Sequence, residues 1–235
     1  MARFDKAALL AAPTLEERVE LGRQQNDTRH GAIVPFTEAF DPEIVDCYFR
    51  FGSGAAFGAA KREGFQPTRR WLYTDEHGVG IYMALRLDHP DGRKKVLPIR
   101  AKSWEGTRTI VEVAAIEKPR PLYNLMELAN APITRPVIVT EGEKSAEAAE
   151  RVFPDAVSTT WSGGCKAVHL ADWRPLIGRR VLIWPDHDKP GWDAAKQLGE
   201  ILRELGVSGL RVVTTPDTFP DGWDVADPVP EVEHA

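Results

Sequence analysis

Residues 136–216 alternate short apolar runs with amphipathic stretches, and this alternation limits the possible folds more than any other feature of the sequence. The runs PVIVT, AVSTTWSGG, RRVLIWPD and LRVVTTP are predicted strands. Helical spacing separates them over 144–153, where Ala146, Ala149 and Val152 should face the sheet, and over 191–205. Repeated βα units build a mostly parallel sheet with helices on both faces. We therefore expect an α/β domain over residues 131–235.

The preceding residues follow a different period. Apolar and polar residues alternate over 71–73, 80–87, 94–100 and 109–114, with the turn sequences DEHG and HPDG between the first three segments. This pattern predicts an antiparallel meander, so residues 66–130 should form a smaller α+β module. A proline-bounded connector with one short helix, PRPLYNLMELANAPITRP, spans the predicted boundary at residue 130. Residues 1–65 are predicted to form a helical segment.

Charge is divided between the two modules. The whole chain has a formal net charge of -5. Residues 61–125 contain 13 basic and 8 acidic residues, whereas residues 137–235 contain 10 basic and 17 acidic residues. A basic module before an acidic one suits a nucleic-acid strand bound beside a metal-binding carboxylate cluster. Ordinary surface variation is the alternative interpretation.

Composition excludes several classes of protein. No run approaches the roughly 18 apolar residues that span a bilayer, and the first residues lack the apolar segment of a signal peptide. The chain has only two cysteines, and no Cys/His spacing in it suits a structural zinc ion. We expect a cytoplasmic protein with no membrane partner and no zinc.

Carboxylates follow three of the predicted strands. Glu141 follows the first strand, Asp186 and Asp188 follow the third, and Asp224 and Asp227 lie in the PDGWDVAD segment after the last. Ligands of such sheets bind beyond the carboxyl ends of the strands. Crowded carboxylates repel one another unless a divalent cation neutralises them, and oxygen ligands without thiolates favour Mg²⁺ or Mn²⁺. Helix caps and solvated loops are the alternative interpretation of these residues.

These motifs resemble a known family. Glu141-Gly142 after a strand, followed by Asp186-His187-Asp188 after a later strand, is similar to the TOPRIM fold of bacterial-type primases, type IA and II topoisomerases and some nucleases. The segments RRVLIWPDHDKPGWDAAKQLGEIL and PDGWDVAD most resemble primases, particularly the primase-helicases of phages and plasmids. Upstream, the basic meander with GRKKVLPI and the RPLYNL segment stand where those primases carry the first half of their catalytic core. The resemblance covers about residues 71–228.

The resemblance implies roles for the acidic residues. Glu141, Asp186 and Asp188 would be catalytic and would bind Mg²⁺, while Asp224 and Asp227 would complete a second metal position. Two divalent cations would stabilise the attacking 3′-oxygen and the leaving pyrophosphate in nucleotidyl transfer. His187 should point away from the two aspartates beside it, because side chains alternate along an extended segment.

Other residues are candidates to hold phosphate groups. Lys144 begins the helix after Glu141 and is predicted either to contact a triphosphate or to be a solvated lysine. Gly163 and Gly164, with Lys166, form a turn whose backbone N–H groups suit phosphate, although such a turn is often only a loop. Basic residues of the meander are candidates to hold template phosphates, with a solvated sheet face as the alternative: Arg69, Arg70, Arg86, Arg93, Lys94, Lys95, Arg100 and Lys102.

The sequence therefore favours a primase catalytic core that joins ribonucleoside triphosphates on a single-stranded DNA template in phage or plasmid replication. A metal-dependent TOPRIM nuclease would use the same carboxylates, and a non-catalytic nucleic-acid-binding accessory of replication or defence is a third reading. The sequence holds neither the zinc-binding module of such primases nor the P-loop of a helicase. A helicase or a zinc-bearing module, in trans or in a longer chain, stays open as a partner.

Overall fold

The computed structural model describes residues 4–14, 17, 32–34, 55–104 and 108–230, without the side chains of 32–34, 55–56, 101–104 and 108–112. The chain divides into two compact units. One comprises residues 13–117, and the other comprises residues 1–12 together with 118–235. No helix in the described ranges is long and apolar enough to cross a membrane.

The unit of residues 13–117 is built on an antiparallel sheet, as the alternating pattern predicts. Tyr73 and Tyr82 stack across two neighbouring strands of the sheet with ring centroids 4.3 Å apart, and both are fully buried. Its elements are β1 (Ala32–Val34), α4 (Ala55–Arg62), β2 (Gln66–Thr74), β3 (Gly80–Asp88), β4 (Lys94–Trp104) and β5 (Arg108–Val113). The strand order is β1-β4-β3-β2, with β5 also paired to β4. The predicted meander is confirmed.

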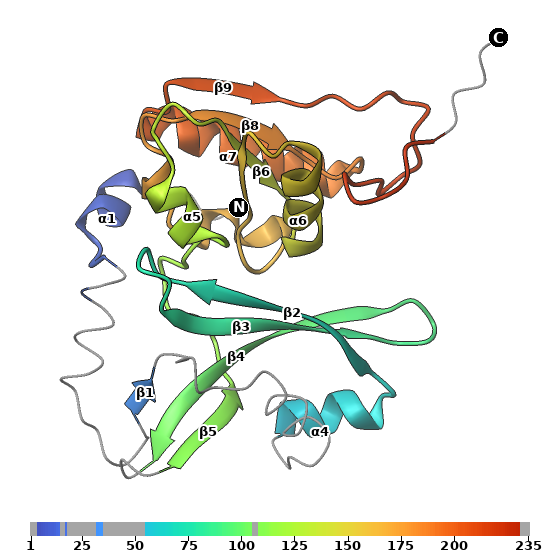
Figure 1. Cartoon of the computed structure of the whole chain (residues 1–235). Coiled ribbons are helices and arrows are strands. Elements are labelled where there is room, and N and C mark those ends of the chain that lie inside the picture. The colour runs from blue at the N-terminus through green and yellow to red at the C-terminus, as the bar shows by residue number, and fades with distance from the viewer. Residues whose placement is uncertain (1–3, 15–16, 18–31, 35–54, 105–107, 231–235) are drawn as a thin grey trace. The chain divides into compact units, whose positions relative to one another are not determined.

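The second unit contains a parallel sheet in the order β7-β6-β8-β9. Its strands are β6 (Val137–Thr140), β7 (Val157–Thr159), β8 (Arg180–Trp184) and β9 (Gly209–Val212). Its helices are α1 (Lys6–Ala11), α5 (Leu125–Asn130), α6 (Glu143–Val152) and α7 (Lys189–Leu205), with the 3₁₀ helices η1 (Cys165–Leu170) and η2 (Arg174–Leu176) (Figure 1). The connections from β6 to β7 and from β8 to β9 cross the sheet in opposite directions. Right-handed crossovers therefore place α6 and α7 on opposite faces, as predicted.

The inner face of α6 differs from the prediction at one residue. Ala146 and Ala149 are fully buried as expected, but Val152 is 58% exposed. Val152 is the last helical residue and therefore lies at the end of the helix that is farther along the chain from the loop carrying Glu141.

The boundary between the units lies at residues 117 and 118, before the predicted boundary at 130. The connector packs on the parallel sheet unit, because the Tyr123 N–H donates to the Thr160 carbonyl (3.0 Å) and the Asn124 side chain donates to the Ser158 carbonyl (3.0 Å). Leu128 of α5 is fully buried. The division also departs from the predicted helical segment over 1–65, because residues 1–12 belong with the parallel sheet.

A buried arginine fastens the end of α5 to this unit. Only 6% of Arg179 is exposed. Its guanidinium donates to the carbonyls of Leu128 (2.8 Å), Ala131 (3.1 Å), Pro132 (3.1 Å) and Pro175 (3.2 Å). Burial lowers the pKa of Arg179. These carbonyls include groups at the carboxyl end of α5, where a cation interacts favourably with the helix dipole.

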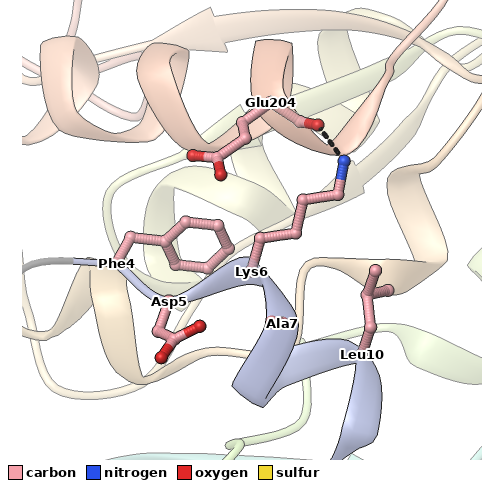
Figure 2. A pocket seen from close by; sticks show the side chains of 6 residues that line it. All are labelled: Phe4, Asp5, Lys6, Ala7, Leu10 and Glu204. Carbon is pink, nitrogen blue, oxygen red and sulfur yellow. Dashed lines mark hydrogen bonds between the residues drawn. The ribbon is translucent and has the colours of Figure 1, made fainter.

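A cavity of about 660 Å³ lies where α1 meets the carboxyl end of α7 (Figure 2). It is lined by Phe4, Asp5, Lys6, Ala7, Leu10 and Glu204. The Lys6 ammonium donates to the Glu204 carbonyl, which attaches the short helix to α7. Because α7 has 17 residues and is about 25 Å long, this cavity is remote from the residues that begin the helix.

Candidate active site at the carboxyl edge of the parallel sheet

Two neighbouring strands bring the predicted acidic residues to one edge of the sheet. Strands β6 and β8 are paired in parallel, and Thr140 is aligned with Trp184 at their carboxyl ends. Glu141 directly follows the first strand, and Asp186 comes two residues after the second. The residues between 185 and 188 thus leave the sheet at the same edge as Glu141. This is the edge at which ligands of parallel sheets bind.

Glu141 lies on a loop held by hydrogen bonds from the neighbouring strands. Gly142 adopts φ +95° and donates its N–H to the Thr160 hydroxyl (2.9 Å), which in turn donates to the Thr140 carbonyl (2.8 Å). The carboxylate itself accepts a hydrogen bond from the Cys165 thiol, with 2.7 Å between Oε1 and Sγ. Cys165 was not predicted to be part of the site.

The pKa of the Cys165 thiol depends on the carboxylates around it. Burial, the hydrogen bond to Glu141 and the charge of Glu141 raise the pKa of Cys165 to about 12, and the charge of Asp188 adds to this rise. Both carboxylates therefore lie close enough to act on the same thiol.

The loop after β8 is shaped by a helix cap and a glycine. Asp188 accepts a hydrogen bond from the Gly191 N–H (2.7 Å) and caps α7. A Cβ atom at Gly191 would lie 2.5 Å from the Asp186 carbonyl, so only glycine fits there. His187 donates and accepts backbone hydrogen bonds with the segment that contains Trp223, and its Nδ1 lies 2.6 Å from the Thr215 hydroxyl. The ring thus contacts Thr215.

The remaining predicted carboxylates surround a lysine. The Lys144 ammonium lies 3.2 Å from an oxygen of Asp224 and 3.1 Å from an oxygen of Asp227. Burial lowers the pKa of Lys144, but the hydrogen bonds to Asp227 and Asp224 outweigh burial and raise the pKa above its usual value. We call these three residues the lysine clamp. Each of the three was predicted from the sequence to be a site residue, but their contact with one another was not predicted.

The two groups of carboxylates differ in how well they fit a divalent cation. Within the described residues, no three His, Cys, Asp or Glu side chains are arranged so that they could hold a metal ion. Glu141, Asp186 and Asp188 nevertheless supply the oxygen donors that Mg²⁺ and Mn²⁺ prefer, at one sheet edge. Asp224 and Asp227 fit less well, because Lys144 already balances part of their charge.

The predicted glycine turn follows β7 and precedes η1. Gly163 and Gly164 have φ of +105° and +69°, and a Cβ at Gly163 would lie 2.5 Å from Nη1 of Arg120. This guanidinium donates to the Ser162 carbonyl (3.0 Å) and so fixes the residue before the two glycines. Lys166 is exposed. Arg120 belongs to the RPLYNL segment, but no role was predicted for it.

Four of the eight predicted template residues in the antiparallel unit have acidic or carbonyl partners. Arg93 pairs with Asp91 (2.8 Å), and Lys95 pairs with Glu63 (2.6 Å) and lies 4.4 Å from the Phe65 ring centroid. We call Arg93, Lys94 and Lys95 the hairpin cations. Lys94 is exposed, as are Arg69 and Arg70.

The other predicted template residues are similar. Arg86 pairs with Asp88 (2.8 Å), and Arg100 donates to the Ala115 carbonyl (3.2 Å). The side chain of Lys102 lies outside the described residues. The positive charge counted from the sequence is therefore partly neutralised within the unit.

Comparison with known proteins gives matches among solved structures. No protein-family model matches this chain, and no curated protein matches it. The primase fragment of the bacteriophage T7 primase-helicase is 13% identical over 68% of this chain and 61% of its own, with a TM-score of 0.43. The DnaG catalytic core is 20% identical over 76% of this chain and 56% of its own, with a TM-score of 0.45.

A third similar structure is the DnaG primase catalytic domain bound to single-stranded DNA. It is 18% identical over 83% of this chain and 58% of its own, with a TM-score of 0.43. The chain thus spans less than two thirds of the length of each of these three proteins. Over most of its own length, this chain is similar to primase catalytic cores.

Proposed function

We propose that this chain is a primase-like nucleotidyltransferase that joins ribonucleoside triphosphates on a single-stranded DNA template and requires Mg²⁺ or Mn²⁺. One observation carries the proposal: Glu141 and the Asp186–Asp188 loop follow adjacent strands whose ends are aligned. The resemblance of these motifs to TOPRIM primases supports the choice of reaction.

In this proposal, the carboxylates at the sheet edge and the glycine turn would have different roles. Glu141, Asp186 and Asp188 would hold the cation, which would supply charge stabilisation for the reacting phosphate and the attacking 3′-oxygen. The turn at Gly163 and Gly164 would offer backbone N–H groups to the triphosphate, with the Lys166 ammonium beside it. Glu141 would also act on the reacting hydroxyl, because it lies at the sheet edge and can accept a proton.

The test uses the purified chain with single-stranded DNA, labelled ribonucleotides and Mg²⁺ or Mn²⁺, and it scores both synthesis and cutting of strands. We expect RNA products from the wild-type chain and none from the variants E141Q and D188A. The control is E147Q, which removes the same charge from α6 four residues beyond Glu143.

Each outcome has a consequence. Products that survive in E141Q and D188A would contradict the assigned site. Cutting without synthesis would identify a nuclease that uses the same carboxylates. Binding of DNA with neither activity would favour the non-catalytic accessory.

A further inference from the structure

The lysine clamp stands where a second divalent cation is expected. All four carboxylate oxygens of Asp224 and Asp227 are engaged by N–H donors of the chain itself. The Lys144 ammonium donates to Oδ2 of Asp224 and Oδ1 of Asp227. The remaining two oxygens accept backbone hydrogen bonds, from the Ala226 N–H to Asp224 (2.7 Å) and from the Asp224 N–H to Asp227 (3.1 Å).

The segment that carries these aspartates is fastened to the unit at several points. Trp223 is only 7% exposed, and its indole N–H donates to the Pro228 carbonyl (2.9 Å). Val225 packs against the buried cluster of Ile138, Ala149 and Ala156. Backbone hydrogen bonds with His187 hold the segment from the other side. The aspartates are therefore presented to Lys144 by a loop whose own contacts fix its position.

We propose that Lys144 is the permanent counter-cation of Asp224 and Asp227, so that this chain binds one divalent cation and carries a lysine in place of the second. The inference rests on the proposed function, which assigns the bound divalent cation to Glu141, Asp186 and Asp188. It departs from the two-metal arrangement that the TOPRIM resemblance implies.

The charges support this assignment. A divalent cation at the two aspartates would have to displace Lys144 or lie beside its positive charge, and it would replace hydrogen bonds already made. The lysine differs from a metal ion in being a single charge tethered to α6, directly after the loop that holds Glu141. It would offer fixed positive charge to a triphosphate without any requirement for a second bound ion.

The test counts the Mn²⁺ ions that bind to the full chain, measured from the free-ion EPR signal in the absence of nucleotide. We expect the K144Q variant to bind one more ion than the wild-type chain at millimolar Mn²⁺. The matched control is K189Q, which removes the same charge from the start of α7, where Lys189 is 85% exposed and pairs with Asp193 (3.0 Å). This variant should bind the wild-type number.

A second variant makes the test independent of how well K144Q folds. The double substitution D224N/D227N should leave the number of bound ions at the wild-type value, because those carboxylates hold Lys144 and no metal. Loss of one ion in this variant, or an unchanged number in K144Q with a wild-type melting curve, would overturn the proposal. Failure of the proposed function gives a different result, namely a wild-type chain whose bound ions are unaffected by E141Q.

Discussion

The hydrogen bond between Cys165 and Glu141 allows the candidate site to be probed without activity. The variant E141Q removes the charge that the thiol faces and replaces the carboxylate by a weaker acceptor. Burial is the largest cause of the raised pKa of Cys165, and it is unchanged in this variant. We therefore expect the pKa to fall from about 12 without returning to its ordinary value of 9.0.

The size of the effect follows from the thiolate population. At pH 8, a rise in pKa from 9.0 to about 12 lowers the fraction of thiolate roughly a thousandfold. A more basic thiolate is also a better nucleophile, and this offsets the loss so that alkylation slows by ~50-fold. E141Q should recover part of this factor, so we expect its alkylation rate to rise several-fold above that of the wild-type chain.

The assay measures iodoacetamide labelling of Cys165 by mass spectrometry, in a C47S background that leaves a single cysteine. E147Q serves as the control, because Glu147 is not among the main causes of the raised pKa of Cys165. A rate for E141Q that equals the E147Q rate, with both chains folded, would refute the reasoning. It would mean that the carboxylate of Glu141 does not control the thiol.

Three further predictions address the rest of the molecule. R179M should lower the free energy of unfolding by about 3–5 kcal/mol in a urea titration, because it leaves buried carbonyls without their charged donor. The control is R180M, at an exposed residue that donates to one carbonyl, and it should lower the free energy of unfolding by less than about 1 kcal/mol. Mn²⁺ should raise the melting temperature of the wild-type chain but not of D186A, since a ligand that binds only the folded state stabilises it; equal shifts would count against the site. For single-stranded DNA binding, K94A should reduce the magnitude of the slope of log K against log salt concentration by about 0.7. Replacement of all three hairpin cations should reduce it little more, because Arg93 and Lys95 have acidic partners.

The sheet and the edge that carries the acidic residues could be predicted because both depend on local patterns. Apolar runs such as VIVT are fully buried in the structure, and the residue after a parallel strand must leave at the carboxyl edge. The connector was harder to assign. Its prolines resemble a linker, yet Leu122 and Leu128 are fully buried against the parallel sheet unit.

The lysine clamp could not be predicted, because its partners are distant in sequence. Lys144 meets Asp224 and Asp227 across separations of 80 and 83 residues, and no local pattern records such pairs. Lys95 and Glu63, 32 residues apart, show the same limit for the basic surface. Counting charges along a segment measures its net charge, but it does not reveal which of those charges are neutralised by another element.

The parallel sheet unit is assembled from both ends of the described chain, and this has a consequence for the order of folding. Residues 13–117 make their internal contacts within one continuous segment. The segment of helix α1, in contrast, binds residues that are synthesised much later, because Lys6 binds the Glu204 carbonyl and the Ala12 carbonyl accepts from Arg174. On the ribosome, the antiparallel unit can therefore fold first as an insertion. The contacts of α1 then form only after Arg174 and Glu204 have been synthesised.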